Sequence, residues 1–467
     1  MTALKPLWKE FEYKEHQKYG VSWMIERESD KDVRGGMLCD EMGLGKTIQM
    51  LGLIKQTQRK ATLLVLPLAV KDQWKQTAMR SHINVMYYIN HSWKLASSMY
   101  LQQPIIYIIG YESLTNNIDM LQNIAFDRLV CDESQRLANK KSKTFKAIKY
   151  IQADCKWFLS ATPIVNSIND VKSVFSLLNK DLEKENLEQT MSCYALVRTM
   201  EQLRSIFTDL PSKPIIETHP IKFINTKEEE FYVTMQTKIE SLLRFNENGL
   251  AAIRMLLMLR QLSIHPQVYI QSRKDKYKGA LKLDDWEEES TKFCAIKDLL
   301  NAEKTTKHKW IIFCHFHSEM KMLKEYLSKL DHINKIEIYS GDLSEKQKKD
   351  VLDNIKLPNE TDKNTELLII QLKSGGVGLN LQEFDRIIFT GPWWTQAIIE
   401  QGIGRAVRIG QTQQVVVHHL LLKREETMVD KTMVMNIDKK MNEKAKEKYA
   451  LNNYYLSLAD SRVKSDT

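Results

Sequence analysis

The stretch "GGMLCDEMGLGKTIQM", from Gly35 to Met50, decides the fold because it almost spells a phosphate-binding loop. The usual pattern needs a glycine, four free positions and then Gly-Lys-Ser/Thr. Gly45, Lys46 and Thr47 supply its end, but Asp40 stands where the first glycine belongs. An apolar run precedes the loop and a helical pattern follows it. We therefore expect a strand, a glycine-built loop and a helix whose N-terminus faces an anion.

The residues of this loop predict a site for ATP and Mg²⁺. Gly43 and Gly45 let the backbone curl without a Cβ clash, and Leu44 lies between them. Lys46 can reach the β- and γ-phosphates, and the Thr47 hydroxyl can bind Mg²⁺. The alternative is a glycine-rich turn between a strand and a helix that binds no nucleotide.

A second candidate is "FDRLVCDESQ", from Phe126 to Gln135, where an apolar strand ends in two carboxylates. Asp132 at such a strand end can hold Mg²⁺, and Glu133 can orient or deprotonate an attacking water. The alternative is a strand followed by an acidic helix cap, because Asp and Ser favour N-cap positions.

A third candidate is "EQGIGRAVRIGQ", from Glu400 to Gln411. Arg405 and Arg408 lie three residues apart, so we expect both on one face of a helix. Two guanidinium groups there could stabilise the charge on a transferring phosphoryl group. They belong to a different part of the chain from the loop, so hydrolysis would need two lobes to close. The alternative is a pair of solvated surface arginines.

Length, charge and cysteine usage narrow the class of protein. The chain has 467 residues, a length that allows several domains. Its net charge of +9 permits a polyanionic partner. Its six cysteines form no CxxC pair, so we expect no zinc and a reducing compartment. We find no apolar run long enough for a membrane helix and expect no membrane. The expected location is intracellular: nuclear in a eukaryote, cytoplasmic in a bacterium or for a virus.

Two blocks of short apolar runs alternate with helical stretches, which predicts an α/β protein with buried parallel strands in two lobes. The expected strands are Met37–Cys39, Thr62–Leu66, Ile105–Ile109, Arg128–Cys131 and Trp157–Ser160 in the first block, and Trp310–Cys314, Lys335–Tyr339, Leu367–Leu372, Arg386–Thr390 and Val415–Leu422 in the second. Between the blocks the strand signal fades and patterns such as Ala251–Leu262 are helical. We therefore divide the chain into lobe 1 (1–168), a helical connection (169–300), lobe 2 (301–437) and a Lys-rich helical tail (438–467).

Taken in order, these pieces resemble the SWI/SNF-like ATPases of helicase superfamily two, from about Gln17 to Lys431. "QKYGVSW", which begins at Gln17, resembles the motif on the adenine side of the site. "CDEMGLGKTIQ" resembles the family's own phosphate loop, in which Asp40 is in pattern. "DESQ" takes the place of Asp-Glu-x-His, so Gln135 is a departure that puts coupling to the second lobe in doubt.

The longest similar stretch runs from Ser374 to Gln411. Here Gly391, Thr395 and Gln396 depart from the usual Asp-Pro-Trp-Trp-Asn-Pro, which could alter contacts with nucleic acid. The resemblance implies two RecA-like lobes with helical protrusions between them, a nucleotide set that includes Gln17 and Gly378, and ATP-driven movement along double-stranded DNA. The nucleic-acid candidates that it implies are Trp74, Lys75, Tyr111, Ser374, Gly375, Asn380 and Trp394.

Structural or solvent-exposed roles, without contact to nucleic acid, remain alternatives for several of these side chains. Trp74 and Trp394 could be core or lobe-interface aromatics, and Lys75 could be a solvated charge. The function also has alternatives: a strand-separating DNA or RNA helicase, or a nucleic-acid-binding scaffold gated by ATP. Protein partners could supply targeting, and the sequence does not identify a pathway or an organism.

Overall fold

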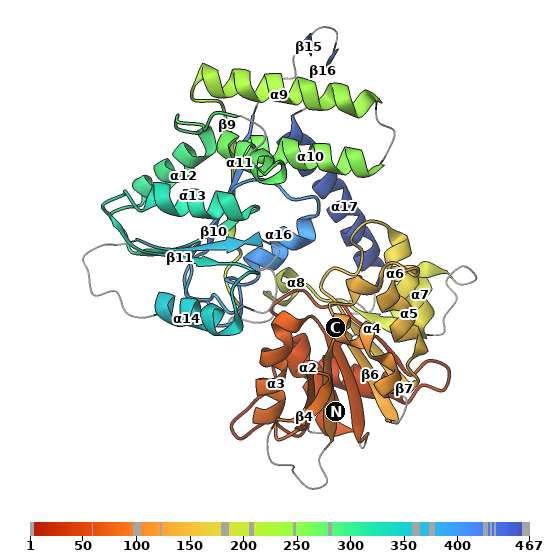
Figure 1. Cartoon of the computed structure of the whole chain (residues 1–467). Helices are drawn as coiled ribbons and strands as arrows, with labels where there is room; N and C mark the ends of the chain where they lie inside the picture. The colour runs from red at the N-terminus through yellow and green to blue at the C-terminus, as the bar shows by residue number, and fades with distance from the viewer. Residues whose placement is uncertain are drawn as a thin grey trace. The chain divides into compact units, whose positions relative to one another are not determined.

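The computed structural model describes thirteen stretches of the chain: 4–57, 59–96, 104–121, 124–178, 186–204, 210–245, 249–278, 283–356, 365–372, 379–423, 428–429, 432–433 and 436–459. The chain forms two compact units (Figure 1). Unit 1 comprises Met1–Leu210 together with Lys448–Thr467, and unit 2 comprises Pro211–Glu447. The finer division into four segments remains a prediction.

Unit 1 is built on an eight-stranded sheet with the order β4-β3-β5-β2-β6-β7-β1-β8. Its pairs are parallel except for the hairpin of β3 and β4. The strands are β1 (Gly35–Leu38), β2 (Ala61–Leu66), β3 (Asn84–Ile89), β4 (Ser92–Leu95), β5 (Ile105–Gly110), β6 (Phe126–Asp132), β7 (Ala153–Leu159) and β8 (Ala195–Leu196).

Helices cover both sides of this sheet, with α2 and α3 on one side and α5, α6 and α7 on the other (Figure 1). The second side holds a core that includes Phe145 of α5, Phe175 of α6 and Met191 of α7. The helices are α1 (Glu15–Glu28), α2 (Lys46–Gln56), α3 (Lys71–Arg80), α4 (Tyr111–Asn116), α5 (Lys143–Tyr150), α6 (Ile168–Phe175), α7 (Leu187–Tyr194) and α8 (Met200–Arg204).

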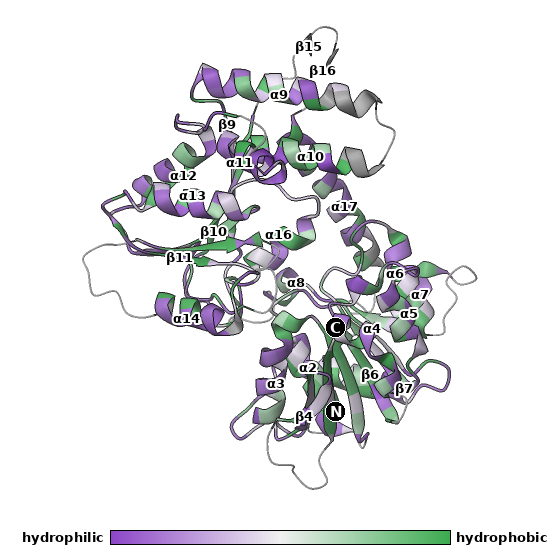
Figure 2. Ribbon diagram, in the orientation of Figure 1, coloured by the Kyte–Doolittle hydropathy of each residue, from purple (hydrophilic) through white to green (hydrophobic). Residues whose placement is uncertain are grey.

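Unit 2 is built on a six-stranded parallel sheet with the order β11-β12-β10-β13-β14-β9. Alternate residues of one strand enter two different cores: Ile311 of β10 packs against α14 and α16, and Ile312 packs against α12 and α13. Burial on both faces explains why such strands are continuous apolar runs, and Figure 2 shows most of them in green. The strands are β9 (Ile215–Ile221), β10 (His308–Cys314), β11 (Ile333–Tyr339), β12 (Thr365–Gln371), β13 (Arg386–Phe389) and β14 (Val416–Leu422), with a separate pair β15 (Met428–Val429) and β16 (Thr432–Met433).

The last helix, α17, contributes to both units. Ile437 and Met441 near its start belong to a core cluster of unit 2 with residues of α9, α10 and α11. Near its end, the Asn452 side chain accepts a hydrogen bond from the Ile164 backbone of unit 1 at 3.3 Å. The helices of unit 2 are α9 (Thr226–Phe245), α10 (Gly249–Ile264), α11 (Pro266–Lys276), α12 (Thr291–Ala302), α13 (His317–Leu327), α14 (Glu345–Lys356), α16 (Gln396–Ile403) and the first part of α17 (Ile437–Ala459).

The predicted α/β fold with two parallel sheets is confirmed, and each of the ten expected strands is present. The segment expected to be helical also supplies β8 to the first sheet and β9 to the second, which the sequence reading missed. β8 has two residues, and β9 is an edge strand with an exposed polar middle, so neither gives an apolar run. Among the described residues, no helix is both long and apolar enough to span a membrane.

Candidate nucleotide site

The glycine-built loop lies between β1 and α2, as its sequence predicts. Gly43 and Gly45 have φ values of 92° and 82°, in the left-handed region that favours glycine. A Cβ atom at Gly45 would also lie 2.7 Å from the Gln17 side-chain amide, so that side chain would have to move to admit one. Gly45 is the N-cap of α2, whose first backbone N–H groups have no partner within the helix and can bind an anion.

Lys46 and Thr47 begin α2 directly after the loop. The Lys46 ammonium donates to the backbone carbonyls of Asp40 at 2.6 Å and Glu41 at 3.4 Å, so it folds back over the loop. Thr47 is partly exposed at the second position of the helix. A cation and a hydroxyl at a helix N-terminus are the groups that the sequence reading assigned to phosphates and Mg²⁺.

Gln17, which the resemblance assigns to the adenine base, is buried against the loop. Its amide donates to the Leu44 carbonyl at 3.5 Å and accepts from the Lys14 backbone at 3.1 Å. His16 lies 3.0 Å from the same Leu44 carbonyl. The Gln17 amide therefore connects the start of α1, through Lys14, to the loop, through Leu44. A contact of Gln17 with a base remains a prediction.

The carboxyl end of β6 carries the two predicted carboxylates. Asp132 accepts hydrogen bonds from the Trp74 indole at 2.8 Å and from the Glu133 backbone at 2.9 Å. Burial, and then the neighbouring Glu133, raise the pKa of Asp132 to about 6, although Trp74 and Lys46 act in the opposite direction. Lys46 thus acts electrostatically on Asp132, because β1 and β6 are parallel strands whose carboxyl ends meet at the same edge of the sheet.

Glu133 adopts a left-handed backbone with φ of 52°, which is uncommon for a residue with a side chain. Its carboxylate accepts from the Gln135 amide at 2.6 Å. The other end of that amide accepts from the Ser160 hydroxyl at 2.8 Å, and Ser160 in turn accepts from the Thr162 backbone at 3.0 Å. Gln135, the departure from the usual histidine, therefore links Glu133 to the chain after β7.

Asp40, the residue in the place of the first glycine, is fully buried in an ion pair that the sequence reading missed. Arg198 contacts its two carboxylate oxygens at 2.9 and 2.5 Å. Gln49 of α2 donates to Asp40 at 2.8 Å and accepts from Arg198 at 2.7 Å. The loop is therefore tied to residues next to β8, and no local pattern could show this because the partners are 158 residues apart.

The nucleic-acid candidates of unit 1 differ in exposure. Trp74 and Tyr111 are each 1% exposed, and both hold the end of β6: the Tyr111 hydroxyl donates to the Asp132 carbonyl at 2.7 Å. Lys75 is partly exposed, and its ammonium lies 4.2 Å from the centre of the Tyr87 ring. Of these three side chains, Lys75 is the one placed for a direct contact with a polyanion.

The expectation that Arg405 and Arg408 share a helical face is wrong. α16 ends at Ile403, and both arginines lie in the turns that follow. Gly404 is the C-cap residue of α16, and Gly410, which follows both arginines, has a φ of 102°. Arg405 is 3% exposed, and burial lowers the pKa of Arg408, whose side chain donates to the Gly404 carbonyl at 2.9 Å.

The remaining predicted residues of unit 2 are only partly visible. Asn380 is exposed, and Trp394 is partly exposed and packs against the core formed by α9, α10 and α11. Ser374, Gly375 and Gly378 lie outside the described residues. The roles predicted for these residues therefore remain predictions.

Comparisons with known proteins match most of this chain. A family model described as "SNF2-related domain" matches residues 16–367. A chromatin remodeling factor of Schizosaccharomyces pombe is 25% identical, with 87% of this chain and 31% of that protein covered. The ISWI chromatin-remodeling complex ATPase of Saccharomyces cerevisiae is 23% identical, with 90% of this chain and 40% of that protein covered.

The structural comparison covers the whole chain. The SWI2/SNF2 ATPase core of Sulfolobus solfataricus in complex with dsDNA is 22% identical, with 100% of this chain and 97% of that chain covered, at a TM-score of 0.41. The chain spans 31% to 46% of the lengths of the first four curated relatives that it matches.

Proposed function

We propose that this chain, which belongs to the SNF2-related family of ATPases, hydrolyses ATP to move along double-stranded DNA. The observation that carries the proposal is the meeting of two elements at one edge of the unit 1 sheet. The loop around Lys46 offers a cation and free N–H groups, and the end of β6 offers Asp132 and Glu133. Positive and negative groups beside a helix N-terminus are the parts that phosphoryl transfer to water needs.

In this proposal Lys46 and the first turn of α2 hold the phosphates of ATP, and Glu133 orients the attacking water. The Asp132 environment fits a divalent cation, because burial and a second carboxylate raise its pKa in the free protein. Thr47 and Asp132 would hold Mg²⁺, which neutralises phosphate charge when it is bound. Arg405 and Arg408 keep the charge-stabilising role that the sequence predicts for them.

The proposal that the protein moves along double-stranded DNA is based on its family and on the named roles of two relatives in chromatin remodelling. The net charge of +9 is compatible with a polyanion. We expect phosphate contacts that carry little base specificity. Lys75, Asn380 and Trp394 are the described candidates with exposed or partly exposed side chains.

The first test measures ATP hydrolysis by the purified chain without nucleic acid and with double-stranded DNA, single-stranded DNA or RNA. The Lys46→Ala variant should abolish turnover, and Lys60→Ala, which removes an exposed lysine of the same unit, should not. Stimulation by duplex DNA that Lys46→Ala loses supports the proposal. Stimulation by single strands or RNA alone would favour the strand-separating helicase.

A second pair of measurements separates the remaining alternatives. Movement along intact duplex should displace the third strand of a DNA triplex, whereas a strand-separating helicase should release one strand of a duplex. The Glu133→Gln variant should bind ATP but lose at least about 100-fold in kcat. ATP-dependent DNA binding by wild-type protein that shows little turnover, kept in full by Glu133→Gln, would favour the ATP-gated scaffold.

A further inference from the structure

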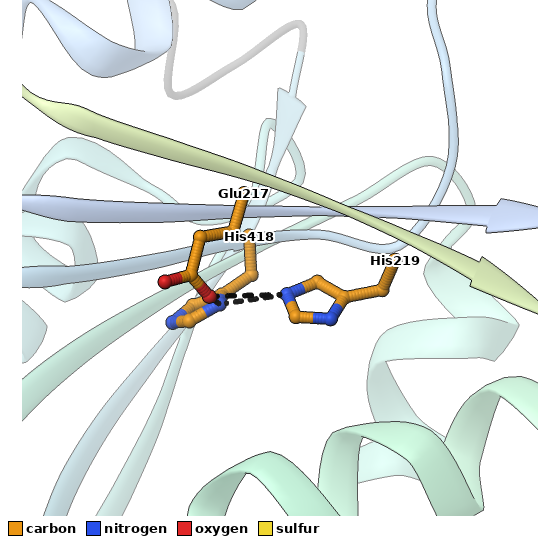
Figure 3. Close-up of side chains that lie close together, drawn as sticks. All are labelled: Glu217, His219 and His418. Carbon is orange, nitrogen blue, oxygen red and sulfur yellow. Dashed lines mark hydrogen bonds and ion pairs between the residues drawn. The ribbon is translucent and has the colours of Figure 1, made fainter.

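Three side chains that can bind a metal converge on the sheet of unit 2, and none of them belongs to the candidate nucleotide site of unit 1. Glu217 of β9 stands opposite His418 of β14 in the parallel register. Residues two apart on a strand point to the same face, so His219 joins Glu217 there. Figure 3 shows both rings and the carboxylate directed toward one another. The strand pairing itself therefore assembles the cluster.

The spacing of the three atoms suits one metal ion. His219 Nε2 lies 3.0 Å from His418 Nδ1 and 3.5 Å from Glu217 Oε2, and His418 Nδ1 lies 3.2 Å from the same oxygen. Ligands about 2.0–2.1 Å from a tetrahedral zinc ion are about 3.3–3.4 Å from one another. The three observed distances bracket that value, so the side chains need little movement to bind.

Protons satisfy this cluster poorly. A neutral histidine has one N–H, so a proton on His418 Nδ1 can serve His219 or Glu217 as its main acceptor. The unprotonated His219 nitrogen then faces the Glu217 carboxylate with lone pair against lone pair. One divalent cation would accept electron pairs from all three atoms at once.

The surroundings hold the ligands in place and keep them accessible. The His418 ring is buried and stacks on the buried Trp310, with ring centres 5.7 Å apart. Glu217 is exposed and His219 is partly exposed, which leaves a path for the ion and room for a water.

We propose that Glu217, His219 and His418 form a site for one divalent transition metal ion, with Zn²⁺ as the first candidate and a water as fourth ligand. Two imidazoles and one carboxylate match the donor preference of Zn²⁺ and differ from the oxygen-only sets of Mg²⁺. The bound ion clamps the edge strand β9 to β14, just after the chain enters unit 2 at Pro211. This site does not depend on ATP hydrolysis.

The experiment uses the full chain, stripped with a chelator and then dialysed. Zn²⁺ binding is measured by competition with a chromogenic chelator, and bound Co²⁺ by its visible spectrum. Wild-type protein should bind one tight equivalent, show a tetrahedral Co²⁺ spectrum and gain thermal stability with added Zn²⁺. His219→Gln and Glu217→Gln should weaken binding at least about 100-fold, since loss of a mere supporting residue costs about 10–100-fold.

Thr218→Ala is the matched control, because Thr218 lies between the two ligands on β9 but faces the other side of the sheet. It should bind metal like the wild type. Circular dichroism of each metal-free variant checks that it folds. The proposal fails if wild-type protein shows no tight equivalent, or if His219→Gln binds as tightly as Thr218→Ala.

Discussion

The indole N–H of Trp74 donates to the carboxylate of Asp132 over 2.8 Å, across 58 residues of sequence. Trp74 is 1% exposed and Asp132 is partly exposed, so the bond is partly shielded from water. A hydrogen bond to the ionised form of a carboxylate lowers its pKa. Trp74 therefore counteracts the burial that raises the pKa of Asp132 to about 6.

This bond predicts the pH dependence of ATP hydrolysis. In the proposed mechanism Asp132 must be ionised to bind the Mg²⁺ of Mg-ATP, so kcat/KM for ATP should fall about tenfold per pH unit below about pH 6. Trp74→Phe removes a bond that favours the ionised form, so the acid limb should move to higher pH. A steady-state pH profile of both proteins measures this shift. If the acid limb of Trp74→Phe does not move but stimulation of ATP hydrolysis by DNA is lost, the result would instead support the DNA contact predicted for Trp74.

The amide of Gln135 predicts a selective loss of turnover. Gln135→Ala cuts the connection from Glu133 to Ser160 but leaves the phosphate loop intact. We expect kcat to fall about 10- to 100-fold, with KM for ATP within about threefold, because Glu133, the proposed water-orienting residue, is misplaced. Gln135→His, which keeps a donor, should lose less. Equal kcat for Gln135→Ala and wild type would refute this role.

The buried pair of Asp40 and Arg198 predicts a large effect on stability. Arg198→Met leaves the Asp40 carboxylate buried without its cation, which should cost about 3–5 kcal/mol. Adding Asp40→Asn should recover part of the loss, and denaturant unfolding of all four proteins gives the coupling. The exposed pair of Arg136 and Glu112 is the control, where Arg136→Met should cost less than about 1 kcal/mol. Equal losses in the two pairs would contradict the prediction.

A second buried pair predicts local opening in unit 2. Lys292 and Asp438 are 2.7 Å apart and each 1% exposed, and Asp438 also accepts from the Leu422 backbone. Lys292→Met should raise amide hydrogen exchange at the start of α17, because an uncompensated carboxylate is left inside. Lys227→Met, which breaks an exposed pair with Glu288, should leave that exchange unchanged. Amide hydrogen exchange at the start of α17 that stays slow in both variants would show that the Lys292–Asp438 pair does not hold this part of the helix in place.

The sequence predicted what depends on local pattern. The apolar run of β2 and the glycines before Lys46 carry their own structural demands, so strand and loop are where they were expected. Arg198 and Asp40 meet only after the sheet has formed, and no spacing rule shows such a pair.

A further miss has a different physical cause. The helical reading of Arg405 and Arg408 failed because α16 ends at its C-cap residue, Gly404, before the first arginine, so the three-residue spacing of the arginines no longer places them on one helical face. The expectation of no zinc rested on cysteines and neighbouring ligands and is not tested by the structure; the proposed site is outside such patterns because His219 and His418 are 199 residues apart and meet by strand pairing.

The position of Pro220 on β9 determines whether unit 2 can add a strand. Ile215 donates its N–H toward β14 and Ile221 accepts from that side, so Ile216, Thr218 and Pro220 direct their backbone to the open edge. Proline has no N–H to donate and its ring projects where a neighbour would lie. An incoming chain would therefore meet a break in the ladder beside the exposed Ile216, and self-association through this edge is disfavoured.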